Sequence, residues 1–249
     1  MDQSSPKPRY ELLDAIRGLA IINMVLYHFS YDVCVLYGVW PALLSDMRAH
    51  VWQQYICFSF ILISGAVWRL GRHHLRQGLL LNGLGLLFTL VTALFVPSAV
   101  IYFGVLSFLG CAMLLMIPLA RPLSRIPAPA GFAASLILFV LLRHLSEGWI
   151  GFSSWAITVP DTWYHGWLST IFGLPFPGFF SSDYFPILPW FFLFTTGHFA
   201  CLWAKQYASA RKVMSYRIPL LSRLGKYSIY VYVIHQPVCM ALCMLIFGF

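Results

Sequence analysis

Four ionisable side chains stand inside one apolar stretch near the start of the chain, residues 14–32 (DAIRGLAIINMVLYHFSYD). They are Asp14, Arg17, His28 and Asp32. A histidine can act as a general base or as a nucleophile that carries an acyl group, and a carboxylate one helical turn away can hold its tautomer. An arginine suits phosphate groups, because its planar guanidinium can donate two parallel hydrogen bonds. These residue types could therefore do chemistry, and the two roles for the histidine stay open.

The spacing places the four side chains on one face of a helix. Arg17 and His28 are eleven positions apart, which corresponds to about 20° around a helix and about 16 Å along it. Asp14 and Asp32 fall within about 60° of this line. Such a stripe would be costly against lipid, so it is expected to face the interior of a helix bundle or a wet cavity. The alternative is local pairing, of Asp14 with Arg17 and of His28 with Asp32.

Composition predicts that the stripe lies in a bilayer. The chain of 249 residues is 60% hydrophobic and 10% charged, whereas soluble domains carry roughly 25% charged residues. The net charge of +8 does not indicate nucleic acid, because the basic residues stand between apolar runs, as membrane topology requires. The six cysteines have neither metal-ligand nor disulfide spacing. We therefore expect no nucleic-acid partner and no metal.

We predict an all-α polytopic membrane protein, a single domain over residues 1–249 with a bundle of about seven transmembrane helices. The first apolar run is too long for a signal peptide and is expected to remain as a helix. Residues 147–184 form one long loop. The expected spans are residues 12–38, 51–70, 77–96, 100–119, 130–146, 185–204 and 227–248, of which the fifth is the shortest.

The basic residues orient this bundle. With alternating sides, 14 of the 16 lysines and arginines fall on one side, and only Arg48 and Arg143 fall elsewhere. The positive-inside rule then places the N-terminus in the cytoplasm and the C-terminus, with the loop 147–184, on the extracytoplasmic side.

The motifs along the chain resemble a known group of membrane enzymes. The run LDAIRGLAIINMVLYH (13–28) is similar to the first helix of membrane acyltransferases, and its ten residues between Arg17 and His28 match the spacing of the acyltransferase-3 family. The whole chain resembles the bacterial members of the heparan-α-glucosaminide N-acetyltransferase family. The further matching stretches are WQQYICFSFILISG (52–65), SSDYFPILPWFFLFTTG (181–197) and LGKYSIYVYVIHQPV (224–238).

This resemblance implies an enzyme of the bacterial plasma membrane that moves an acetyl group from cytosolic acetyl-CoA to a hydroxyl or amine acceptor. The acceptor would be a cell-surface or lipid-linked sugar. The family's functional arginine and histidine would map onto Arg17 and His28. The animal enzyme is longer and has a large luminal portion, so the resemblance does not extend to its heparan-derived acceptor.

A second histidine is placed to complete the catalytic site. The last span enters from the same side as the first, and His235 lies at a depth similar to that of His28, on a face shared with Ser228 and Tyr232. A purely structural hydrogen bond to a neighbouring helix explains His235 equally well. We expect His198 to be structural.

The donor and the acceptor would bind at opposite sides. Phosphate groups of coenzyme A could be held by Arg17 together with Arg69, Arg72, Arg76 and Lys226, although topology and anionic lipid explain most of these cations too. Acceptor candidates are Asp183 and Tyr184, with Gln53 as a third residue that an interhelical hydrogen bond would also explain. The tryptophans of the loop 147–184 suit sugar stacking, but an aromatic belt at the headgroups explains them as well.

Two other classes of protein compete with the acyltransferase. A transporter or a proton- or anion-conducting protein could use the charged stripe of the first helix, but the sequence has no internal repeat of the kind transporters show. A non-catalytic scaffold would not need a buried stripe. Expected partners are membrane lipids, coenzyme A and a small acceptor, and homo-oligomerisation stays open.

Overall fold

The structure is a computed structural model that describes residues 10–44 and 46–248. Within these residues it contains ten α-helices, and seven helical segments are long and apolar enough to cross a membrane. The prediction of an all-α protein with seven spans is confirmed. Lys7 and Arg9, two of the basic residues that set the predicted orientation, lie outside the described residues.

The ten helices fall into seven long ones and three short ones. The long helices are α1 (Glu11–Tyr31), α2 (Met47–Val67), α3 (His74–Phe95), α4 (Val105–Leu123), α5 (Ala128–Leu142), α7 (Ile187–Ala204) and α10 (Ser228–Phe247). The short helices are α6 (Gly166–Phe172), α8 (Ala208–Met214) and α9 (Pro219–Lys226). A π-helical turn, Asp32–Leu36, directly continues α1.

Six predicted spans agree with the structure to within about four residues at each end, and the fourth needs a correction. It was expected at 100–119 but begins at Val105. A 3₁₀ turn (Pro97–Ala99) is followed by an irregular segment that bonds to residues 181–185. Ser182 N–H donates to the Val100 carbonyl and Phe185 N–H to the Phe103 carbonyl, each at 3.0 Å. The helix then continues to Leu123 through Pro118 and Pro122.

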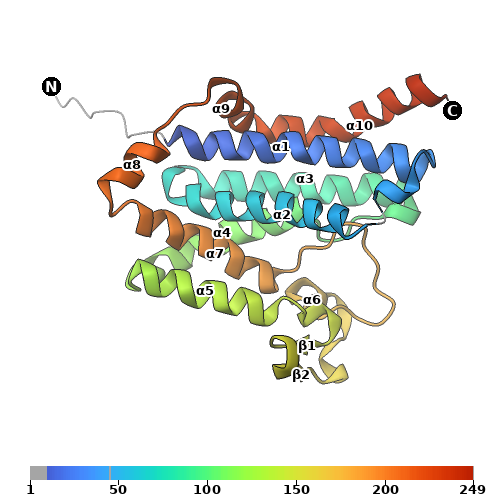
Figure 1. The fold of residues 1–249 in the computed structure, drawn as a ribbon. Helices are drawn as coiled ribbons and strands as arrows, with labels where there is room; N and C mark the ends of the chain where they lie inside the picture. The colour runs from blue at the N-terminus through green and yellow to red at the C-terminus, as the bar shows by residue number, and fades with distance from the viewer. Residues whose placement is uncertain (1–9, 45, 249) are drawn as a thin grey trace. The chain divides into compact units, whose positions relative to one another are not determined.

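The chain divides into two compact units, of which the first comprises residues 10–63 and 204–248. Its helices α1 and α10 run side by side in the same direction, and α9 lies against the first half of α1 (Figure 1). Ile21 and Met24 of α1 form a buried core with Ile56 of α2, which Leu224 of α9 also packs against. The indole N–H of Trp52 donates to the Asn23 side chain at 3.0 Å and ties α2 to α1.

Two glycines allow α1 and α9 to touch through their backbones. A Cβ atom at Gly18 would lie 2.0 Å from the carbonyl oxygen of Leu221, and one at Gly225 would lie 1.7 Å from that of Asp14. Both distances are far inside van der Waals contact, so only glycine fits at either position. Small residues at membrane helix crossings have this effect in general.

The second unit comprises residues 64–203 and contains the loop of residues 147–184. Its helices α3 and α4 pack closely at Gly85. A Cβ atom there would lie 2.2 Å from the Ser107 hydroxyl oxygen, so the absence of a side chain allows this contact. The loop is not structureless: it contains α6 and a two-stranded antiparallel sheet of β1 (Trp149–Ile150) and β2 (Ile157–Thr158). Backbone bonds of Ser182 and Phe185 to Val100 and Phe103 fix the end of the loop to the segment before α4.

Candidate functional site

The contact between α1 and α10 brings the two predicted catalytic histidines together. The ring centroids of His28 and His235 lie 4.8 Å apart, with the rings tilted by 59°. Tyr232, one turn before His235, has its ring centroid 5.4 Å from the imidazole. His235 is buried, with 7% of its surface exposed. The similar depth expected for the two histidines is what places them in ring contact.

The backbone sets the tautomer of His235. Its Nδ1 lies 2.5 Å from the carbonyl oxygen of Tyr232, and a carbonyl can only accept, so Nδ1 carries the proton. In the neutral ring, Nε2 then holds a lone pair. This atom is buried and has no hydrogen-bond partner within the described residues. A buried imidazole nitrogen with an unused lone pair is what a general base or a nucleophile requires.

Asp32 is held by α10 rather than by His28. Gln236 Nε2 donates to both carboxylate oxygens of Asp32, at 3.0 and 3.1 Å. No hydrogen bond joins Asp32 to His28 in the described part of the chain, so local pairing of these two residues is wrong. Asp32 is almost fully buried, at 1% exposure. The two helices are therefore linked by two adjacent pairs, His28 with His235 and Asp32 with Gln236.

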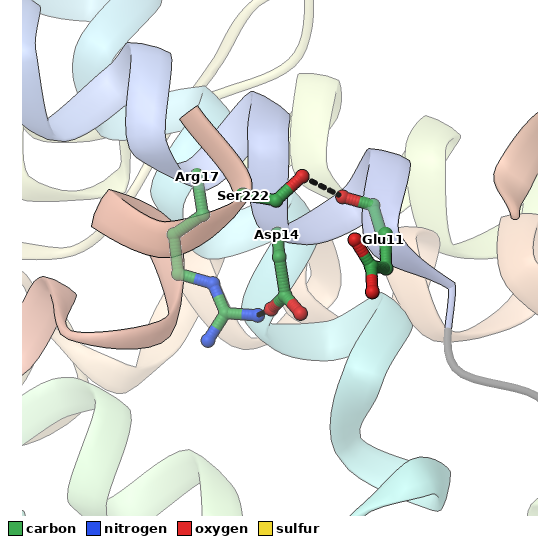
Figure 2. A network of polar contacts seen from close by, with 4 residues as sticks. All are labelled: Glu11, Asp14, Arg17 and Ser222. Atoms are coloured by element: carbon green, nitrogen blue, oxygen red, sulfur yellow. Dashed lines mark hydrogen bonds and ion pairs between the residues drawn. The ribbon is translucent and has the colours of Figure 1, made fainter. Parts of the chain in front are cut away.

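At the other end of α1, Arg17 does pair locally. Its Nη2 lies 2.8 Å from Asp14 Oδ1 (Figure 2). Beside this pair, the Ser222 hydroxyl of α9 donates to the Glu11 carbonyl at 3.1 Å. The Glu11 carboxylate in turn lies 3.0 Å from Arg217 Nε. Polar contacts and the glycine crossing thus fix α9 on the same turns of α1 that carry Arg17.

The predicted donor-binding residues lie on both units. Arg17 is partly buried in the first unit, and Lys226 is exposed there, with its ammonium 5.8 Å from the Tyr227 ring centroid. The remaining three, Arg69, Arg72 and Arg76, are exposed in the second unit, between the end of α2 and the first turn of α3. Exposed cations of this kind are free to meet phosphate groups.

The predicted acceptor residues have structural partners. Asp183 Oδ2 accepts from the Val105 N–H at 3.0 Å, so the carboxylate bonds the first turn of α4. Burial raises the pKa of Asp183 to about 6, against an ordinary value of 3.8. The Tyr184 hydroxyl donates to the Thr170 carbonyl, and burial raises its pKa. Gln53 is exposed on α2. Asp183 and Tyr184 therefore shape the loop, and their role in binding stays a prediction.

A cavity of about 260 Å³ opens in the second unit between α3, α4 and α6. Its aromatic lining residues are Tyr102, Phe103, Trp167 and Phe179, and the ring centroids of Tyr102 and Trp167 lie 5.3 Å apart. Its polar lining residues are Asn82, Thr89, Ser107 and Thr170. Tyr102, Trp167 and Phe179 also border a second hollow of about 300 Å³. Aromatic faces with a few hydroxyl and amide groups are typical of pockets for small polar molecules.

Sequence reasoning missed two parts of this arrangement. Gln236 carried a usable signal, because it is a polar residue directly after His235 in an apolar span. The cavity carried none, because Tyr102 and Trp167 are 65 positions apart and meet only through the folded loop. Within the described residues no group of three metal-ligating side chains occurs.

Fold and site together define a polytopic helical membrane protein in which two spanning helices face each other with histidines. Comparison with known protein families identifies the family to which this membrane protein belongs. The chain belongs to the heparan-alpha-glucosaminide N-acetyltransferase catalytic family, whose family model matches residues 9–237. No curated protein and no solved structure matches the chain. Family membership implies a membrane acetyltransferase.

Proposed function

We propose that the protein transfers an acetyl group from acetyl-CoA, bound from the cytosol, to a hydroxyl or amine of a cell-surface or lipid-linked sugar. The observation that carries this proposal is the ring contact of His28 with His235. The Nε2 atom of His235 is buried and has a lone pair that no described donor uses. The family supports the acetyl transfer. The residues support a base in the membrane-spanning part of the chain.

Histidine alone can accept and return the proton that the proposed acetyl transfer requires. The acceptor hydroxyl or amine attacks the thioester carbonyl and gives its proton to an imidazole nitrogen, while the carbon–sulfur bond breaks. The imidazolium then returns the proton to the departing thiolate, so that coenzyme A leaves as a thiol. The neighbouring imidazole of His28 can take part by moving this proton or by carrying the acetyl group in a two-step transfer.

The phosphates of the donor are proposed to bind at Arg17 and Lys226 in the first unit, and Arg69, Arg72 and Arg76 of the second unit form a separate cationic candidate for the same role. A bidentate guanidinium suits a phosphate better than an ammonium does. For the acceptor, the aromatic cavity is a better candidate than Asp183 and Tyr184, because those two side chains already bond the chain itself. Trp167 is 55% exposed and offers a face for stacking.

Histidine substitutions test the catalytic step. The assay incubates reconstituted protein with radiolabelled acetyl-CoA and a panel of amino- and hydroxy-sugars. Loss of a general base typically costs about 10²–10⁴-fold in rate, so His28→Asn and His235→Asn should each lose transfer while retaining stabilisation by coenzyme A. His198→Asn is the control, because His198 is a buried histidine of α7 in the second unit. Wild-type turnover in both His28→Asn and His235→Asn would refute the proposal.

Two separate tryptophan substitutions, one in the cavity and one outside it, test the acceptor site. Trp167→Ala removes one wall of the cavity and should raise the KM for the acceptor about 10-fold, with the KM for acetyl-CoA unchanged, since stacking on one aromatic ring is worth about 1–3 kcal/mol. Trp155→Ala is the matched control, because Trp155 belongs to the same loop, is 86% exposed and does not line the cavity. Equal effects of the two substitutions would exclude the cavity as the acceptor site.

A further inference from the structure

The segment between α7 and α10 contains basic residues and no acidic residue. Residues 184–249 contain no aspartate and no glutamate. Six cations lie between the two spans: Lys205, Arg211, Lys212, Arg217, Arg223 and Lys226. Only residues 205–227 separate the end of α7 from the start of α10, so the segment leaves the membrane and returns within a short distance. It must therefore lie near the headgroups.

Helix α9 presents two different faces. Ser222 and Gly225 are buried against α1, through the hydroxyl bond to Glu11 and the close backbone crossing. The opposite face carries Arg223 together with Leu220, which is 70% exposed. The face that does not touch α1 is thus both cationic and apolar.

The preceding segment repeats this combination. On α8, Lys212 is exposed next to Val213, which is 59% exposed, while Met214 is buried. Tyr216, in the turn between α8 and α9, is 65% exposed. Both short helices lie at the end of α1 that carries Arg17 (Figure 1). The short segment between the two spans thus exposes two cations and three large apolar side chains, and we define its exposed surface as Lys212, Val213, Tyr216, Leu220 and Arg223.

This surface suits an anionic phospholipid better than a soluble phosphate compound. A soluble phosphate compound would need the cations but would leave Val213, Tyr216 and Leu220 in water. An anionic phospholipid satisfies both kinds of side chain, because its phosphate meets the cations and its glycerol and upper acyl chain cover the apolar groups. Each lysine or arginine near an anionic surface strengthens the binding about 5-fold.

We propose that this surface of α8 and α9 binds the headgroups of anionic phospholipids and thereby presses α9 onto α1. Because the buried face of α9 packs on Glu11, Asp14 and Gly18, a lipid that orders α9 also orders the turn that holds Arg17. The surface therefore makes the stability of this end of α1 dependent on the lipid composition. The inference does not depend on the acetyl-transfer reaction.

Lipid retention by the full-length protein tests the proposal. The protein is purified in neutral detergent, stripped of lipid, and mixed with phosphatidylglycerol or with phosphatidylcholine of the same acyl chains. Native mass spectrometry counts retained lipid, and thermal unfolding measures stabilisation. Phosphatidylglycerol should be retained and should raise the Tm, whereas phosphatidylcholine should not. The effect should weaken as salt rises above 0.1 M, where charges are screened beyond about 10 Å.

Matched variants locate the binding. Lys212→Gln with Arg223→Gln should weaken phosphatidylglycerol binding by about 25-fold, which corresponds to about 5-fold per lost charge. Arg121→Gln with Arg125→Gln is the control, because it removes two exposed cations from the last turn of α4 and the turn that follows it. Lys212→Arg with Arg223→Lys keeps the charges and should retain binding, so that a loss from misfolding is recognised.

Competing anions decide between lipid and a soluble phosphate ligand. Coenzyme A and inorganic phosphate are added at equal ionic strength to wild type and to the Lys212→Gln, Arg223→Gln protein. Stabilisation by phosphatidylglycerol alone that depends on this pair supports the proposal. Equal protection by coenzyme A through the same two residues would overturn it, as would equal losses in the test and control pairs or equal retention of the two lipids.

Discussion

Gly18 and Gly225 face each other where α1 and α9 cross, and each helix lies in the space that a side chain of the other would need. The obstructing atoms are the carbonyl oxygens of Leu221 and Asp14, at 2.0 and 1.7 Å from the respective Cβ positions. Backbone atoms cannot move aside as a side chain can. The glycine of the Arg-Gly motif therefore has a physical role of its own, which is to let α9 reach the turn that carries Arg17.

Alanine at either glycine should separate the two helices. Overpacking of a close contact typically costs about 1–3 kcal/mol, so Gly18→Ala and Gly225→Ala should each lower the Tm of the purified protein by several degrees. Gly83→Ala is the control, because a Cβ at Gly83 of α3 would meet no atom within 4 Å. Removing a glycine from a helix interior favours the helix, so this variant should be neutral or slightly stabilised. A similar loss in all three variants would argue against the crossing.

The pair of Asp32 and Gln236 should behave as one coupled unit. Gln236→Leu leaves a nearly buried carboxylate without its only described donor, and such a group is costly in an apolar environment. We expect Gln236→Leu and Asp32→Leu each to be destabilising and the double variant to be less so than their sum, with a coupling of about 1–2 kcal/mol. Reversible unfolding in detergent measures the cycle. Additive effects would show that the two side chains do not interact.

Sequence reasoning predicted the spans because twenty apolar residues in a row have one stable arrangement in a bilayer. It also predicted a similar depth for His235 and His28, since two helices that enter from the same side reach similar depths after similar numbers of residues. The start of α4 could not be predicted. Residues 100–104 are as apolar as a helix, and their bonds to Thr92 and to residues 181–185 hold them in an irregular segment.

The partner of Asp32 shows why side-chain pairing was harder to predict. Spacing of four residues puts His28 and Asp32 on the same face of α1, and this favoured a local pair. The carboxylate instead receives both bonds from Gln236 of α10. The periodicity of a helix gives the direction of a side chain but not the register of the neighbouring helix. That register decides which group of the neighbouring helix the side chain contacts.

Asp183 should make stability depend on pH. Its pKa is about 6 in the folded protein, against an ordinary value of 3.8, so between these values the folded state holds a proton that the unfolded state has lost. Stability should therefore fall as the pH rises from about 4 to about 6 and stay level above that. Asp183→Asn still offers an oxygen to the Val105 N–H and should flatten this slope. Thermal unfolding from pH 4 to 8 checks it.

An exposed carboxylate of the same loop supplies the control for this pH series. Asp161→Asn removes a carboxylate that lies on the surface of the loop, and it should leave the pH dependence of the Tm as in wild type. An unchanged slope in Asp183→Asn would mean that another group causes the dependence.

The proposed orientation can be tested with two single cysteines. Ser154 lies in the loop 147–184 and Ser209 on α8, and both residues are exposed. If the N-terminus is cytoplasmic, a membrane-impermeant maleimide added to intact cells should label Ser154→Cys and should label Ser209→Cys only after the membrane is opened. The parent protein gives the background, because its six cysteines are buried or partly buried. Labelling of Ser209→Cys alone in intact cells would reverse the orientation. It would then move Arg17, Arg72 and Lys226 away from the cytosolic pool of acetyl-CoA, and the proposed donor site would fall with it.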